Sequence, residues 1–146
     1  NPPTEMIFPG NWVYGHQTIN WNVELNRDLP LVLRFHTGAC DAKLDLADLK
    51  VTELVIETGA SSTEVHLPKN AGFTRVKVTS GAADIKLFVP QGVSASIRDS
   101  SGLSGINVDM TRFVQNGRTY QSADYDTASN KIEILNEGGV GSLSIN

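Results

Sequence analysis

The chain has three histidines, His16, His36 and His66, and imidazole is the side chain best suited to metal binding and to proton transfer near neutral pH. A metal site needs several ligands that the fold brings together. His36 lies two residues before Gly38 and His66 lies seven residues after Gly59, so the two occupy different positions of the glycine repeat described below. The sequence therefore predicts surface or corner histidines rather than a column of ligands.

Three aspartates, Asp41, Asp45 and Asp48, are spaced like part of a calcium-binding loop. An EF-hand also requires a glycine for its sharp turn and a terminal bidentate glutamate, and the sequence lacks both at the matching positions. The glycine-rich aspartate repeat of calcium-binding β-rolls does not occur either. We therefore expect these aspartates on a solvated outer face or in a turn, and we expect no bound metal.

Two further carboxylates, Asp124 and Asp126, flank Tyr125. Paired carboxylates perform general acid–base catalysis when their environments separate their pKa values. Nothing in the sequence indicates such separate environments, so we predict no catalytic residues here.

The possible nucleophiles are also isolated. Cys40 is the only cysteine, so it cannot form an intrachain disulfide, and we expect it in a tight corner between strands. Ser100, Ser101 and Ser104 lie in no Gly-x-Ser-x-Gly elbow. No glycine-rich loop precedes a helix that could hold a phosphate group. The sequence predicts a protein that is not an enzyme and has no cofactor.

The composition is that of one ordinary globular domain. The chain has 146 residues, with 12 basic and 16 acidic side chains and a formal charge of −4, which argues against nucleic-acid binding. No apolar run reaches the roughly 18 residues of a membrane helix, and no signal peptide is evident. The chain begins at Asn1 rather than at a methionine, so we expect a processed product or a piece of a longer protein.

A glycine-centred tripeptide organises the sequence. Its glycines are Gly38, Gly59, Gly81 and Gly102, at spacings of 21, 22 and 21 residues, and Gly139 begins a truncated fifth copy. A fixed period of this size is typical of a solenoid. Glycine suits a corner between two strands because it can adopt positive φ and allows backbones to approach closely. We predict an all-β fold, a short single-stranded β-solenoid of about five rungs.

Apolar residues alternate with polar residues in the same phase within every copy, as expected for strands with one buried face. They lie five and three residues before each glycine and four, six and eight residues after it. The first two copies are Leu33, Phe35, Ala42, Leu44 and Leu46, followed by Leu54, Ile56, Thr63, Val65 and Leu67.

Two polar residues break this ladder. Asp99 stands where Phe35, Ile56 and Val78 stand in earlier copies, and Asn136 stands in the same position one copy later. An unpaired carboxylate in a core costs several kcal/mol, so Asp99 should have polar partners. We predict that both residues mark the edge of the apolar core, where they hold a capping insertion.

The repeat divides the chain into four parts: an N-terminal cap and entry strand at residues 1–30, rungs at 31–110, a capping insertion at 111–130 and a last partial rung at 131–146. The insertion contains Asn116-Gly117, which is a strong hairpin signal. No helix is predicted.

Several of these segments resemble bacterial toast-rack domains, and more narrowly the C-terminal domain of LiaF-like proteins, the cell-wall-active antibiotic response proteins. The resemblance covers the chain from about Leu25 onward. Its main motifs are Val51–Ser61, Leu67-Pro68, Ser80-Gly81-Ala82-Ala83, Val89-Pro90-Gln91-Gly92-Val93, Gly102-Leu103-Ser104, Tyr125-Asp126-Thr127-Ala128 and Gly139-Val140-Gly141-Ser142.

In that family the domain follows N-terminal transmembrane helices, and some members restrain a membrane histidine kinase that responds to envelope stress. The resemblance implies a membrane-associated regulatory domain whose partner is such a kinase system, another protein or a second copy of itself. The side of the membrane stays open, and the family has no catalytic residues to carry over. Two alternatives remain, a carbohydrate- or cell-wall-binding β-solenoid and a structural self-assembly module.

Overall fold

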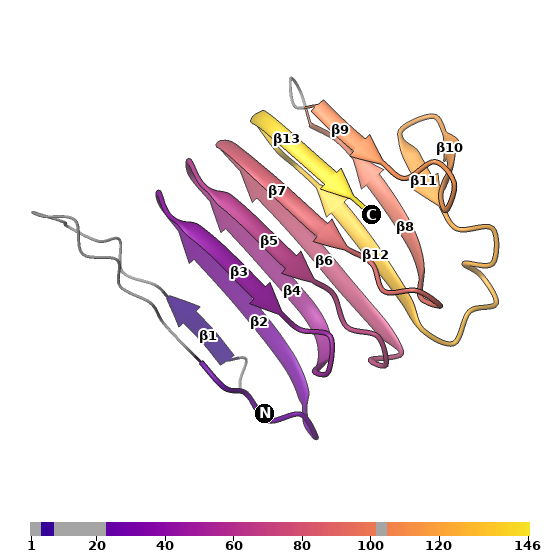
Figure 1. The fold of residues 1–146 in the computed structure, drawn as a ribbon, viewed down its shortest axis with the longest axis horizontal. Helices are drawn as coiled ribbons and strands as arrows, with labels where there is room; N and C mark the ends of the chain where they lie inside the picture. Colours follow the sequence, from indigo (N-terminus) through magenta and orange to yellow (C-terminus); the bar gives the residue numbers. More distant parts are fainter. Residues whose placement is uncertain (1–3, 8–22, 102–104) are drawn as a thin grey trace, which may run out of the picture.

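The computed structural model describes residues 4–7, 23–101 and 105–146, and all of its regular structure is β. The strands form two sheets that lie one over the other (Figure 1). The eight-stranded sheet has the order β1-β2-β4-β6-β12-β8-β11-β10, and the five-stranded sheet has the order β3-β5-β7-β13-β9. No helix that is long and apolar enough to span a membrane occurs within these described ranges.

The strand bounds follow the repeat. The eight-stranded sheet contains β1 (Thr4–Ile7), β2 (Pro30–Thr37), β4 (Lys50–Thr58), β6 (Phe73–Ser80), β8 (Ser94–Asp99), β10 (Val114–Asn116), β11 (Thr119–Gln121) and β12 (Lys131–Asn136). The five-stranded sheet contains β3 (Asp41–Asp45), β5 (Ser62–His66), β7 (Ala82–Phe88), β9 (Gly105–Val108) and β13 (Val140–Ile145).

Ten of these strands form five strand pairs, each with one strand in either sheet. The first to fifth pairs are β2 with β3, β4 with β5, β6 with β7, β8 with β9, and β12 with β13. Neighbouring pairs run parallel and in register, so that Leu33, Leu54 and Val76 align across three strands. The predicted all-β class and the common register of the copies are therefore observed.

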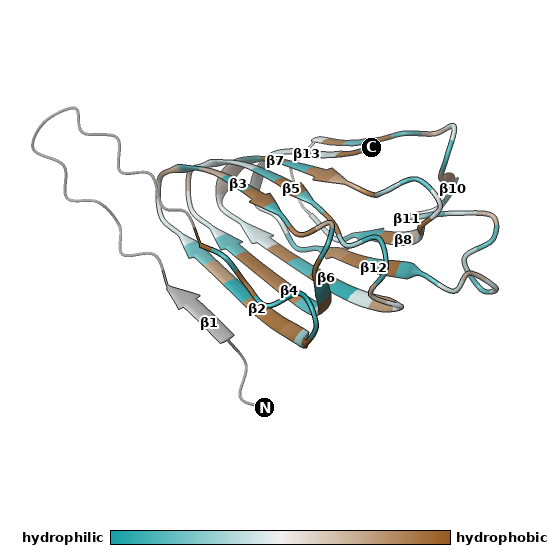
Figure 2. Cartoon of the chain, turned by 60° about the horizontal axis from the view of Figure 1, so that its bottom comes forward, coloured by the Kyte–Doolittle hydropathy of each residue, from teal (hydrophilic) through white to brown (hydrophobic). Residues whose placement is uncertain are grey.

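The apolar core lies between the two sheets. Hydrophobic and hydrophilic residues alternate along the strands of the five pairs (Figure 2), which gives these strands one face that is more buried than the other. Ile56 and Val78 from one sheet and Leu87 and Ile145 from the other are fully buried. The buried Thr74 has a partner inside the core: its hydroxyl donates a hydrogen bond of 2.7 Å to the carbonyl oxygen of Val51.

The spatial order of the strand pairs differs from their order in the sequence. The repeat predicts the fifth pair beyond the fourth, but β12 pairs with both β6 and β8, and β13 pairs with both β7 and β9. Figure 1 shows the two yellow strands between their pink and orange neighbours. All copies share one register, so the local pattern does not decide which copies become neighbours. Insertion gives each C-terminal strand two hydrogen-bonded partners instead of one.

Other strands cover the two ends of the eight-stranded sheet. At one end β1 pairs in parallel with β2, and at the other the hairpin of β10 and β11 lies antiparallel on β8. The hairpin occurs where Asn116-Gly117 predicts it, with Gly117 at φ 62° in the turn. Most of the N-terminal cap and entry strand predicted at residues 1–30 lies outside the described residues.

Candidate functional site

The outer face of the five-stranded sheet carries a group of charged and aromatic side chains that includes His66, one of the histidines considered in the sequence analysis. We call Lys43, Glu64, His66 and Phe88 the outer cluster. They come from β3, β5 and β7, which are adjacent strands. Strand alternation turns these four side chains outward because their neighbours in sequence, such as Val65 and Leu87, point into the core.

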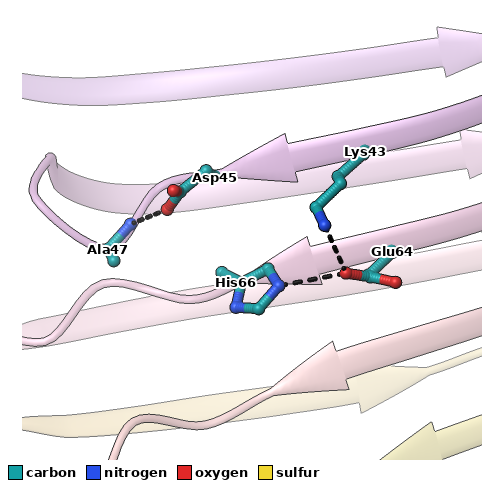
Figure 3. Close-up of polar contacts among 5 residues, drawn as sticks. All are labelled: Lys43, Asp45, Ala47, Glu64 and His66. Atoms are coloured by element: carbon teal, nitrogen blue, oxygen red, sulfur yellow. Dashed lines mark hydrogen bonds and ion pairs between the residues drawn. The ribbon is translucent and has the colours of Figure 1, made fainter.

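Glu64 is the centre of the outer cluster. Its Oε1 atom accepts contacts of 3.1 Å from Lys43 Nζ and 3.1 Å from His66 Nε2 (Figure 3). The His66 ring stacks on Phe88 with centroids 4.6 Å apart and an interplanar angle of 11°. The group thus presents a carboxylate, an ammonium group and two stacked rings on one surface.

These contacts change the electrostatics of Glu64. The hydrogen bond from His66, and next the one from Lys43, lower the pKa of Glu64 below its ordinary value of 4.5, while desolvation acts in the opposite direction. Both contacts favour the charged carboxylate. Within the described ranges, no group of three or more His, Cys, Asp or Glu residues is arranged to hold a metal ion. The arrangement can recognise charged or ring-shaped groups on a partner.

Replacement of Glu64 by glutamine should reduce stability in a pH-dependent way. A carboxylate whose folded pKa is lowered contributes stability that is present above its unfolded pKa and is lost as the pH falls through the folded pKa. The difference in unfolding free energy between wild type and Glu64→Gln should therefore have its largest value above about pH 5 and decrease as the pH falls below 4.5. Urea denaturation at a series of pH values measures it.

The control for this prediction is Glu53→Gln. Glu53 is a half-buried carboxylate on β4 that makes no ion pair among the described residues. A difference for Glu64→Gln that stays constant from pH 7 to below pH 4, or that Glu53→Gln reproduces, would contradict the role of the His66 and Lys43 contacts.

The structure brings Asp99 and Asn136 together. Asn136 is 2% exposed and its Nδ2 donates a hydrogen bond of 2.8 Å to Asp99 Oδ1. The same oxygen accepts the backbone N–H of Ser101 at 3.1 Å, so the carboxylate has the partners that its burial requires. Because β12 lies between β6 and β8, Asn136 stands between Val78 and Asp99 and not beyond Asp99 as the repeat order predicts.

The corner glycines form a close stack. A Cβ atom on Gly59 would lie 2.6 Å from the carbonyl oxygen of Gly38, one on Gly81 would lie 3.1 Å from that of Gly59, and one on Gly139 would lie 2.9 Å from that of Gly81. None of these four has a positive φ, so the expectation of positive φ is wrong at these corners. Close backbone approach favours glycine at Gly59, Gly81 and Gly139, whereas a Cβ atom on Gly38 would meet nothing within 4 Å. Gly102 lies outside the described residues.

Three of the remaining candidate carboxylates, Asp45, Asp48 and Asp124, have polar partners. Asp45 accepts the backbone N–H of Ala47 at 3.2 Å (Figure 3). Asp48 forms an ion pair of 2.7 Å with Lys69, which lowers the pKa of Asp48. Asp124 accepts a hydrogen bond of 2.6 Å from the Ser94 hydroxyl. Each aspartate therefore contacts a different partner.

Sequence reasoning overlooked one residue that joins distant segments. Arg112 donates to the carbonyl oxygens of Val89 at 2.7 Å and Pro90 at 3.0 Å. This guanidinium holds the connector between β7 and β8 from a position just before the hairpin. A single arginine after the fourth copy gives no signal of such a contact, because backbone carbonyls leave no trace in the sequence.

Comparisons with known proteins found one similar solved structure and one matching family model. A crystal structure of a candidate cell adhesion protein from Clostridium sporogenes is similar, with a TM-score of 0.76 and 22% sequence identity over 90% of this chain and 66% of that one. At that identity the likeness concerns the fold. No curated protein matches the chain. The family model described as the N-terminal domain of toast_rack, DUF2154, matches residues 4–88. The chain therefore belongs to the toast-rack family.

Proposed function

We propose that the chain is a non-enzymatic interaction domain, in which the strand pairs act as the rungs of a short β-solenoid and one flat outer face binds a protein partner. Parallel pairing in one register supports the solenoid description. The resemblance to LiaF-like proteins suggests the setting, a bacterial membrane-associated protein of the envelope-stress response whose partner is a histidine-kinase system.

One row of side chains on the eight-stranded sheet carries the proposal. Strand pairing aligns Arg34, Val55, Lys77, Leu135 and Arg98 across five adjacent strands. Alternation turns this row outward, because the neighbouring positions on each strand lie in the core or at its edge.

The row alternates cations and aliphatic side chains. Adjacent strands lie about 4.8 Å apart, so the cations recur about every 10 Å with an apolar contact between them. Lys77 also pairs with Glu137 at 3.1 Å. Such a row fits a protein segment that presents acidic and apolar side chains in turn, because complementary charge selects and orients a partner. The fold neighbour's description as a candidate cell adhesion protein is in keeping with an interaction role.

A charge reversal in the row tests the proposal. The longer protein that is expected to contain this chain is used to capture histidine kinases and other envelope proteins from bacterial membranes. The affinity of the purified chain for each captured partner is then measured. Arg98→Glu should weaken binding at least about tenfold, since like-charge contacts at an interface cost several kcal/mol. The control Lys86→Glu reverses an exposed charge on the other sheet. Recovery of no envelope partner, or equal weakening by both variants, would overturn the proposal.

The stacked rings of the outer cluster support carbohydrate binding as a second candidate. His66 and Phe88 form a ring pair on the outer face of the five-stranded sheet, and aromatic faces suit apolar sugar surfaces. Calorimetry with cell-wall fragments should then show saturable binding that Phe88→Ala removes. Absence of binding by the wild-type chain would exclude this candidate.

A further inference from the structure

The C-terminal strand pair is the fifth of the five in sequence order, yet each of its strands lies inside a sheet with a neighbour on both sides. β12 lies between β6 and β8, and β13 lies between β7 and β9. Among the described residues, no strand pairing joins β6 to β8 or β7 to β9. Residues 131–146 therefore fill a slot whose four flanking strands all precede them in the chain.

The slot makes side-chain contacts that are particular to this segment. Asn136 bonds to Asp99 at 2.8 Å, and the Ser142 hydroxyl donates to Asp84 at 2.6 Å. The carbonyl oxygen of Ala83 occupies the position that a Cβ atom on Gly141 would take. A strand with other residues at these positions would lose the hydrogen bonds or clash.

Charge pairs on the outer face add to this match. Glu133 contacts Arg75 at 3.0 Å, and Glu137 contacts Lys77 at 3.1 Å. Both acidic residues belong to the inserted side and both basic residues belong to β6. The segment that fits the slot best is this segment itself, whether it comes from the same chain or from a second copy.

The connection to the segment allows it to leave its own chain. Residues 122–130 join β11 to β12, and some of their bonds are local turns, such as Tyr125 N to Ser122 O. Others tie the connection to its surroundings: Ser122 bonds to Ala95, Asp124 to Ser94, and Asn130 to Ser94 and Gly72. These bonds open and re-form when the segment changes chains. A stretch of this length spans up to about 30 Å when extended. During synthesis the acceptor strands are complete before the segment emerges, since chains are made from the N-terminus at about 5–20 residues per second.

We propose that two copies of this chain exchange residues 131–146, so that the C-terminal strand pair of each fills the slot of the other. The exchange reproduces every contact of the slot, and so its equilibrium depends mainly on protein concentration and on the connecting segment. The product is a two-fold dimer with a reciprocal interface. It gives the self-assembly alternative a defined partner and a defined surface.

Single-cysteine variants test the exchange in the chain of residues 1–146. Lys86 on β7 and Ser144 on β13 are register partners on the outer face, and a disulfide can join side chains on neighbouring strands at such spacing. In a Cys40→Ser background, Lys86→Cys and Ser144→Cys are purified separately, mixed, unfolded, refolded together at high concentration and oxidised. Exchange places one thiol of each chain side by side, and intact mass measures the linked heterodimer.

The control mixture combines Lys43→Cys with Ser144→Cys. Lys43 occupies the same outward row, but on β3, which does not border the slot. Exchange should give at least about tenfold more heterodimer with Lys86→Cys than with Lys43→Cys, because adjacent thiols reach millimolar effective concentration. The double variant Lys86→Cys with Ser144→Cys, refolded when dilute, should form an intrachain disulfide. If the double variant forms this disulfide but the two mixtures yield equal amounts of heterodimer at every protein concentration, the exchange does not occur.

Discussion

Replacement of Gly141 by alanine is expected to destabilise the protein by about 3 to 5 kcal/mol, because two penalties that each cost about 1 to 3 kcal/mol act together. The new Cβ would meet the backbone of Ala83, whose carbonyl oxygen occupies its position and whose nitrogen would lie 2.9 Å away. Gly141 also has φ 155°, a conformation that other residues rarely adopt. Neither penalty is easily relieved, since β13 is paired on both sides.

The matched control is Gly105→Ala on β9, the neighbouring strand of the same sheet. A Cβ atom on Gly105 would meet nothing within 4 Å, so this variant should change the unfolding free energy by less than about 1 kcal/mol. Equilibrium denaturation with urea compares the two. A Gly141→Ala protein as stable as Gly105→Ala would show that β13 does not approach β7 as closely as described.

Replacement of Phe113 by alanine is expected to cost about 3 to 5 kcal/mol, the usual result of removing a buried phenylalanine side chain. Phe113 belongs to the segment before the hairpin, yet it is 0% exposed and joins the main core. The Arg112 guanidinium lies 5.1 Å from the centre of its ring. Removal of the Phe113 side chain would leave a cavity under the capping insertion and weaken the packing at that end of the core.

The comparison for this variant is Val114→Ala, one residue further along the chain. Val114 is 66% exposed, and an exposed position of this kind should change stability by no more than about 0.5 kcal/mol. Thermal and urea denaturation of both variants provide the measurement. If Phe113→Ala lowers the unfolding free energy as little as Val114→Ala does, the capping insertion does not contribute to the core.

Much of the local structure could be predicted from spacing alone. The period of 21 to 22 residues places the strands, and the alternation of Thr63 and Val65 with Glu64 and His66 predicts which face is buried. Both features are local, because a strand's alternating faces follow directly from backbone geometry. The hairpin after Phe113 could also be predicted from local sequence, since a turn depends on a few adjacent residues.

The candidate sites could be predicted only in part. The irregular positions of Asp99 and Asn136 identify them as special, but their hydrogen bond depends on β12 lying next to β8. The outer cluster needs the order of β3, β5 and β7, which the repeat does predict, and also the side-chain conformations that bring His66 and Phe88 into a stack. Rotamers of exposed side chains depend on neighbours that are distant in sequence.

The all-β class, the positions of the ten paired strands, their buried faces and the register shared by all copies follow from the spacing of residues in the sequence. The place of the fifth strand pair, between the third and the fourth, is a property of the folded chain that the spacing does not contain. The physical reason is that all copies share one register, so the backbone of a strand can form nearly the same hydrogen bonds with a strand of any other copy. The local pattern therefore does not distinguish one neighbour from another. Specific contacts make that choice, among them Asn136 with Asp99 and the space for Gly141 beside Ala83.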